Sequence, residues 1–237
     1  MSPNVRYAIY WLPKQDSLLW QLGSHWLGYD SYRQTNIDRQ PIAGVDFASM
    51  KIMTQRPARY GFHATLKAPF YLNHAYVESD LIKSVENLCS QQKAVQSSGL
   101  LLADMGAYIG LSMGDSNSAL SLVELANVLV EKLDKFRQPM TIQDRDNRIA
   151  KGLDARGIEL LDSWGYPAVK ERFHCHLTLV DSNINNNERV KKSSMMQVLQ
   201  DYFNAVLGEQ MLVDEIALMK QVDGRAFTVL KTIPLES

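Results

Sequence analysis

The sequence predicts an α+β fold made of two lobes, each with an antiparallel sheet and flanking helices. The order strand, helix, strand, helix and then paired strands occurs twice along the 237 residues. The segments 211–221 and 225–233 are joined through Asp223-Gly224, a dipeptide typical of tight β-hairpins. Paired strands of this kind favour antiparallel sheets over the parallel sheet of a Rossmann-type fold.

The first series of elements occupies the first half of the chain. Residues 5–11 are an aromatic and β-branched run that Pro13 ends, as expected of a strand. A helix follows from Asp16 to Gly28, and residues 30–60 form a long connector with one candidate short helix over 46–54. The remaining elements expected here are a strand over 60–67 closed by Pro69, a helix over 78–92 and two short strands within 100–113.

The second series begins with a helix over 118–136. It carries a Ser-x-x-Glu start signal at Ser121 and Glu124, and its apolar residues recur with the helical period. The elements expected after it are a helical stretch over 144–164, a strand over 172–180, a helix over 195–207 and the C-terminal hairpin.

Composition favours one bilobal domain over residues 1–237. With 46% apolar residues the chain can bury a large core, and no low-complexity linker divides it. The 25 basic and 26 acidic residues leave a net charge of −1, which provides no overall field for holding a long nucleic acid. No segment reaches the roughly 18 to 20 apolar residues that span a bilayer, and the first residues lack an apolar signal core, so a cytoplasmic protein without membrane contact is expected.

Two tripeptides of the form His-x-Thr are the main candidates for chemistry: His63-Ala64-Thr65 and His176-Leu177-Thr178. Each lies in a predicted strand, where alternate side chains point to opposite faces. The histidine and threonine of each motif therefore share one polar face, and the apolar residues between them face the core. Lys67 is expected on the same face as His63 and Thr65, and His174 on the same face as His176.

Two imidazoles and two hydroxyls suit the cleavage of a phosphodiester. The reaction needs a base to deprotonate the attacking oxygen and an acid to protonate the departing one, and imidazole titrates near neutral pH. We predict that His63 and His176 divide these roles, without deciding which is the base. Thr65 and Thr178 are expected to donate to the non-bridging phosphate oxygens, where charge develops. Neither a metal nor a cofactor is required.

The paired motifs, each followed by leucine, resemble those of the two-histidine (2H) phosphoesterase superfamily, and more narrowly its branch associated with phosphonate metabolism, a domain of unknown function. The resemblance covers most of the chain. The segments that carry it include residues 6–10, 26–28, 59–70, 163–167 and 173–179. It implies a bilobal fold with a pseudo-twofold axis, a cleft between the lobes and one His-x-Thr motif from each lobe. It also implies a small phosphoester substrate such as a nucleoside or ribosyl cyclic phosphate, and a link to phosphonate metabolism.

Several other residues are weaker candidates for phosphate binding. Lys67 could neutralise the phosphate, or it could be a surface lysine beyond the strand end. Arg6, Arg137 and Arg172 could form bidentate phosphate contacts, although most surface arginines are solvated or paired. His174 is a further weak candidate for phosphate binding. Cys89 and Cys175 lack the number and spacing of a disulfide framework or a metal finger, so we expect free thiols.

Two alternative functions remain open. One is a non-catalytic module that binds a nucleotide or an RNA end. The other is a metal hydrolase that uses His174 and His176, because histidines two residues apart on a strand can chelate a metal. Gly106 and Gly110 do not belong to a phosphate loop, because the lysine and the helix start of such a loop are missing.

Overall fold

The computed structural model describes residues 4–97, 99–113, 116–181 and 192–236. The helices in these ranges are α1 (Leu18–Leu27), α2 (Phe47–Tyr60), α3 (Glu78–Cys89), α4 (Ser116–Lys132), α5 (Ile142–Ile149), α6 (Ala155–Trp164) and α7 (Lys192–Phe203). The strands are β1 (Val5–Trp11), β2 (Tyr29–Asp30), β3 (Thr35–Asn36), β4 (Ala64–Tyr71), β5 (Val95–Ser97), β6 (Leu100–Asp104), β7 (Tyr108–Met113), β8 (His176–Asp181), β9 (Met211–Val213), β10 (Glu215–Val222) and β11 (Thr228–Pro234).

The main sheet consists of two parts that meet at one point. Its strand order is β11-β10-β1-β4-β8-β7-β6, and the strand pairs within it are antiparallel. The central strands β4 and β8 are joined only through the pair Ala64 and Leu177. A four-stranded lobe (β11-β10-β1-β4) and a three-stranded lobe (β8-β7-β6) therefore share a narrow seam. This arrangement confirms the predicted α+β class with antiparallel sheets.

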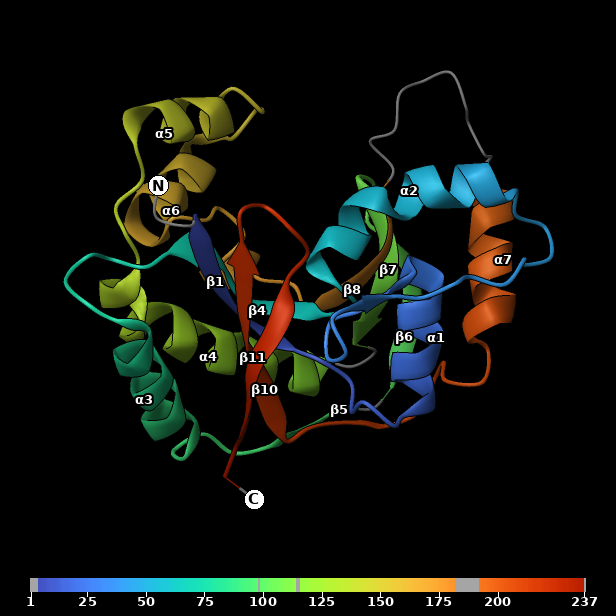
Figure 1. Ribbon diagram of the computed structural model, residues 1–237, viewed down its shortest axis with the longest axis horizontal. Coiled ribbons are helices and arrows are strands. Elements are labelled where there is room, and N and C mark those ends of the chain that lie inside the picture. The colour runs from blue at the N-terminus through green and yellow to red at the C-terminus, as the bar shows by residue number, and fades with distance from the viewer. Residues whose placement is uncertain (1–3, 98, 114–115, 182–191, 237) are drawn as a thin grey trace.

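The two halves of the chain exchange their hairpins. The β6–β7 hairpin follows β4 in sequence but pairs with β8, and the β10–β11 hairpin follows β8 but pairs with β1. The helices are exchanged in the same way: α1 packs on β8, and α4 packs on β4. Figure 1 shows α3 and α4 against the four-stranded lobe, and α1 and α7 against the three-stranded lobe. Cutting the chain at its midpoint would separate each hairpin from the strand it pairs with.

Local element boundaries differ from the expectations where prolines and glycines lie. The helix expected over 46–54 continues as α2 to Tyr60, past Pro57, because α2 packs along β8. The strand expected to close at Pro69 continues to Tyr71, and Pro69 falls at a shift in the register with β1, where a missing N–H is tolerated. The stretch 144–164 is two helices, since Gly152 has a φ of +91° and Asp154 caps α6.

The core fills both lobes around the sheet. Its largest fully buried side chains include Trp11, Trp20, Trp26, Tyr10 and Phe62. Trp26 from α1 donates its indole N–H to the carbonyl of Leu179 on β8 at 2.9 Å, which ties the swapped helix to the three-stranded lobe. Among the described residues, no helix has both the length and the apolar character needed to cross a bilayer.

Candidate active site at the seam between β4 and β8

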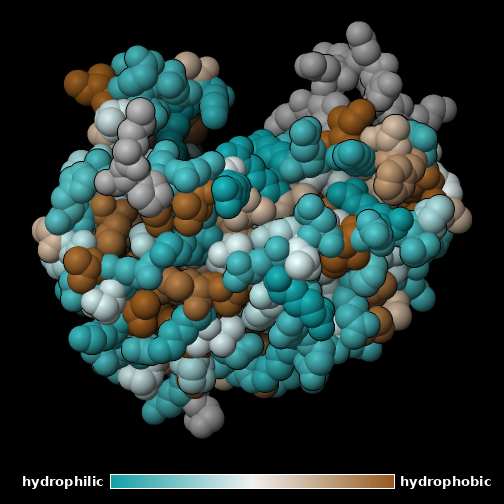
Figure 2. Space-filling view, in the orientation of Figure 1, coloured by the Kyte–Doolittle hydropathy of each residue, from teal (hydrophilic) through white to brown (hydrophobic). Residues whose placement is uncertain are grey.

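The seam brings the two His-x-Thr motifs together. The pair Ala64–Leu177 is the middle residue of both motifs, so the antiparallel register sets His63 opposite Thr178 and Thr65 opposite His176. The two imidazoles then occupy diagonal positions, a separation of roughly 7 to 8 Å between backbone positions on neighbouring strands. Ala64 and Leu177 are fully buried on the other face, whereas all four polar residues are partly exposed. Figure 2 shows the surface hollowed between α5–α6 and α2, the helices on either side of the seam.

His63 is held by its own strand and by a tyrosine from β1. Its Nδ1 lies 2.9 Å from the carbonyl oxygen of Gly61, and because a carbonyl only accepts, Nδ1 carries the proton. The other nitrogen, Nε2, lies 3.0 Å from Oγ1 of Thr65. The Tyr10 ring stacks on the imidazole with a centroid distance of 3.8 Å. These contacts fix the ring plane and leave Nε2 for chemistry.

His176 repeats this arrangement on β8. Its Nδ1 donates to the carbonyl of His174 at 2.7 Å, again two residues upstream. Its ring stacks on Tyr108 from β7, with centroids 4.5 Å apart. The two histidines therefore share the same tautomer and the same kind of support, each from a tyrosine on the neighbouring strand.

Burial keeps both imidazoles neutral at pH 7. It lowers the pKa of His63 from 6.5 to about 4; the charge of His176 lowers this pKa further, and the hydrogen bond to Gly61 raises it. Burial also lowers the pKa of His176, against the raising effect of the hydrogen bond to His174. A neutral imidazole with Nδ1 protonated presents the Nε2 lone pair, which can take a proton from a substrate or water.

Lys67 does not lie on the face that the sequence predicted, beside His63 and Thr65. The register with β1 shifts after Thr65, with Tyr10 opposite Thr65 but Ile9 opposite Lys67, so a β-bulge at Leu66 turns Lys67 to the opposite face. There Lys67 is only 3% exposed and donates from Nζ to the carbonyl of Val130 at 3.1 Å. Burial lowers its pKa to about 8, although Asp134 at 3.8 Å raises it. Lys67 is thus a buried structural cation between β4 and α4.

The same bulge occurs in β8. Gly110 pairs with Thr178 but Ile109 pairs with Val180, so the shift again follows the threonine and turns Val180 into the core. Gly110 permits the close approach of β7, since a Cβ there would lie 2.6 Å from the carbonyl oxygen of Leu177. Both motifs are therefore followed by a buried leucine and a bulge, which extends the pseudo-twofold relation beyond the tripeptides.

The weaker candidates fall in different places. Arg6 projects from β1, donates from Nε to Gln221 at 2.8 Å and lies 5.7 Å from the centre of the Phe227 ring. Arg137 forms a bidentate pair with Asp134. Arg172 is bound to Asp154 through two contacts of 2.7 Å outside the seam, so the structure does not bring it to the histidines.

His174 is exposed, and the centre of its ring lies 6.2 Å from that of His176. It contributes to the seam through its backbone carbonyl, which orients His176. In the part of the chain that the structure describes, no group of three or more His, Cys, Asp or Glu side chains is placed to hold a metal ion. Cys89 and Cys175 are free thiols, and both are buried.

Several aromatic residues at the seam were not singled out as site residues from the sequence. Tyr60 lies 6.3 Å from the His63 ring and stacks on Phe227 at 5.6 Å. Tyr166 follows Gly165 in the segment 163–167, and burial raises the pKa of its hydroxyl. The sequence signal for them is their position within the segments 59–70 and 163–167, next to glycines that allow tight turns.

The chain is similar in sequence to one described family and to curated proteins. A family model described as "Protein of unknown function (DUF1045)" matches residues 65–228. A curated relative from Janthinobacterium sp. (strain Marseille), named ribose 1,5-bisphosphate phosphokinase PhnN, is 30% identical over 97% of this chain and 51% of its own length. Another with the same name, from Laribacter hongkongensis, is 34% identical over 74% of this chain and 40% of its own length. The chain thus spans about half the length of the curated relatives it matches.

Solved structures similar to this chain include LigT of E. coli. Its complex with 3′-AMP matches at 15% identity over 99% of both chains, with a TM-score of 0.45. Its complex with phosphate matches at 15% identity over 100% of both chains, with a TM-score of 0.47.

Proposed function

We propose that this chain, which belongs to the DUF1045 family of proteins of unknown function, is a phosphodiesterase that cleaves a small cyclic phosphoester with two histidines. The observation that carries the proposal is the matched geometry of His63 and His176. Each imidazole has Nδ1 bound to a carbonyl two residues upstream, which leaves Nε2 unprotonated, and the strand register sets each histidine opposite a threonine. A binding site needs hydrogen-bond donors, but it does not need two titrating groups in the same tautomer.

We assign the role of general base to His63 and that of general acid to His176. The lowered pKa of His63 keeps its Nε2 unprotonated over the whole neutral range, ready to take the proton of an attacking water. The acid must be protonated when the substrate is bound. A phosphate anion between the rings raises the pKa of the adjacent imidazoles, and the more exposed surroundings of His176 favour its protonation. His176 then gives its proton to the departing sugar oxygen as the P–O bond breaks.

Thr65 and Thr178 bind the non-bridging oxygens in this mechanism. The Thr65 hydroxyl lies 3.0 Å from Nε2 of His63, and it can rotate to donate to a phosphate oxygen. Thr178 lies opposite His63 on the other strand. Donors fixed on two strands stabilise the charge that grows on these oxygens in the transition state. The chain's own residues supply every proton transfer in this scheme.

A ribosyl cyclic phosphate is the substrate class that we favour, with a nucleoside cyclic phosphate next. The curated relatives are named for a kinase of ribose 1,5-bisphosphate, and this chain lacks the G-x-x-x-x-G-K-S/T loop of many kinases. Opening a cyclic diester that includes O1 of ribose 5-phosphate, with the phosphate left on O1, would yield that bisphosphate. We propose a link to phosphonate metabolism only because this product is the compound for which the curated relatives are named.

Turnover tests the proposal directly. Purified protein is assayed in the presence of a chelator against ribosyl cyclic phosphates, 2′,3′-cyclic nucleotides and 2′,5′-linked dinucleotides, beside a His63→Ala/His176→Ala double variant. Hydrolysis by the wild type and none by the double variant is the expected result. Binding without turnover would favour a non-catalytic nucleotide or RNA-end module. Activity lost in chelator and restored by metal would favour a metal hydrolase at His174 and His176.

A further inference from the structure

A cavity of about 390 Å³ lies where the start of β1 meets the end of β4. Its walls come from the start of β1, the end of β4, the segment 137–141, α5 and the turn at Gly165. Three arginines line it: Arg6, Arg137 and Arg148. One acidic residue, Asp144, lines it as well, and its carboxylate accepts the hydroxyl proton of Thr141 at 2.8 Å. Such a lining is suited to an anion.

Two of the three arginines have no carboxylate partner among the described residues. Arg6 donates to the amide oxygen of Gln221, a side chain only 2% exposed, which itself donates to the carbonyl of Arg225. Arg148 donates from Nη1 to the carbonyl of Gly165 at 3.3 Å. Both guanidinium groups are therefore oriented by neutral oxygens and keep a full positive charge for a ligand.

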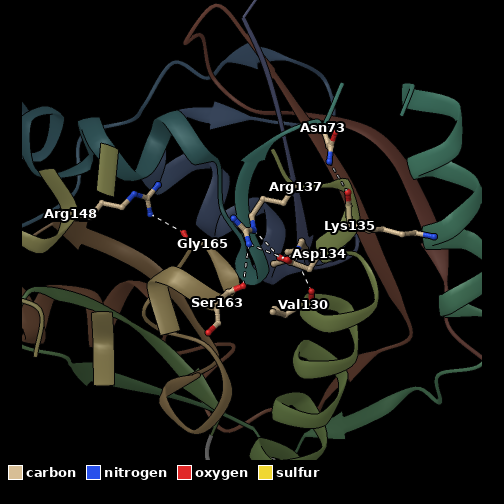
Figure 3. Close-up of polar contacts among 9 residues, drawn as sticks. Asn73, Val130, Asp134, Lys135, Arg137, Arg148, Ser163 and Gly165 are labelled. Carbon is tan, nitrogen blue, oxygen red and sulfur yellow. Dashed lines mark hydrogen bonds and ion pairs between the residues drawn. The ribbon is translucent and has the colours of Figure 1, made fainter. Parts of the chain in front are cut away.

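Arg137 is held rigidly at the same wall. It binds Asp134 through Nε at 2.8 Å and Nη2 at 3.0 Å, and it donates to the carbonyl of Ser163 at 3.2 Å. Figure 3 shows Arg137 and Arg148 directed at the turn that contains Ser163 and Gly165. Gly165 has a φ of +74°, and a Cβ there would lie 2.8 Å from Cδ of Arg137. Only glycine lets the two arginines meet at this turn.

The cavity and the histidine site lie on the same face of β1. Arg6 lies on β1 on the same face as Tyr10, which stacks on His63. Arg6 and Tyr10 are four positions apart along the strand, a spacing of roughly 13 Å between their backbones, and the Arg6 side chain can span part of it. The fully buried Phe227 ring lies between the two residues, 5.7 Å from the guanidinium of Arg6 and 5.8 Å from the Tyr10 ring, and so packs beneath this interval. On the other wall, Gly165 is followed by Tyr166.

We propose that the arginine cavity binds a second phosphate of the substrate, at a distance of about one pentose from the phosphate that is cleaved. This inference rests on the proposed function and makes it narrower. The substrate class becomes a sugar phosphate that carries a terminal phosphomonoester in addition to the cyclic diester. Arg6 and Arg148 bind the phosphomonoester, and Arg137 positions the turn on which Arg148 rests.

Equilibrium binding of two probes tests this inference. Ribose 1-phosphate and ribose 1,5-bisphosphate are titrated calorimetrically into the wild type, Arg6→Ala, Arg148→Ala and the control Arg172→Ala, whose guanidinium is bound to Asp154 outside the cavity. The wild type and the control should bind the bisphosphate about 10- to 100-fold more tightly, the range expected for charge-assisted hydrogen bonds. Each cavity variant should lose most of this preference and keep its affinity for ribose 1-phosphate.

Equal affinities for the two probes in the wild type would overturn the inference. Failure of both probes to bind, or a preference that survives in both cavity variants, would overturn it as well. Because the readout is equilibrium binding, an absence of hydrolysis would count against the proposed function alone.

Discussion

The two His-x-Thr strands share their sequence pattern and backbone geometry but differ in their surroundings. Both have a carbonyl two residues upstream, a stacked tyrosine from the neighbouring strand, and a bulge after the threonine. His63 lies among Tyr10, Tyr60 and Gly61, and burial there lowers its pKa to about 4. His176 lies beside the exposed His174. The difference shows how one motif, used twice, can place two imidazoles in unequal surroundings, which in the proposed mechanism suits one to the role of base and the other to that of acid.

The largest expected effect comes from removing either imidazole. His63→Ala and His176→Ala should each lower kcat/KM for a cyclic phosphoester by about 10²- to 10⁴-fold, the usual contribution of general acid–base catalysis. The double variant should lose little more than the worse single variant, because the two groups act as a unit. Steady-state kinetics on the four proteins measures this. If the loss in the double variant equalled the product of the two single losses, the two histidines would act independently rather than as a pair.

The threonines come next. Thr65→Val and Thr178→Val keep the shape of the side chain and remove its hydroxyl, so each should lower kcat by about 10- to 100-fold, somewhat less than the loss of an oxyanion donor in a protease. Similar losses for the two variants would show that the two threonines contribute equally, as the twofold relation of the strands predicts. A loss confined to one variant would show that only one strand binds the phosphate in the transition state.

The depressed pKa of His63 also predicts a pH-dependent stability. The unfolded chain binds a proton at His63 near pH 6.5 and the folded chain only near pH 4, so the stabilising effect is complete above pH 6.5 and is lost as the pH falls toward 4. Between pH 7 and pH 5 the wild type should lose about 2 kcal/mol more stability than His63→Gln. Urea unfolding at both pH values measures the difference. Parallel losses in both proteins would mean that His63 titrates normally.

The smallest functional effect is expected at Lys67. Lys67→Met removes a buried cation that contacts Val130 and Asp134, so it should change thermal stability while leaving kcat/KM within about threefold of the wild type. Thermal unfolding and kinetics on the same preparation separate the two effects. A large loss of kcat/KM in a folded variant would show that Lys67 contributes to activity and not only to stability.

Sequence periodicity was sufficient to predict the paired motifs and insufficient to predict their surroundings. Alternation along a strand correctly set Thr65 beside His63, because the two residues precede the bulge. It failed for Lys67, since the bulge arises from the register with β1, which no local pattern records. Tyr108 reaches His176 through the exchanged hairpin, and Arg148 reaches the arginine cavity from α5; such long-range arrangements depend on the whole fold.

A leaving-group comparison tests the divided roles of the two strands most directly. A p-nitrophenyl phosphodiester releases a stable anion and needs no proton from an acid, whereas a cyclic phosphoester releases a sugar alkoxide that does. His176→Ala should therefore retain most of its activity toward the nitrophenyl ester and lose activity toward the cyclic ester, while His63→Ala should lose both. Equal losses of His176→Ala on both substrates, or recovery in His63→Ala instead, would contradict the assignment.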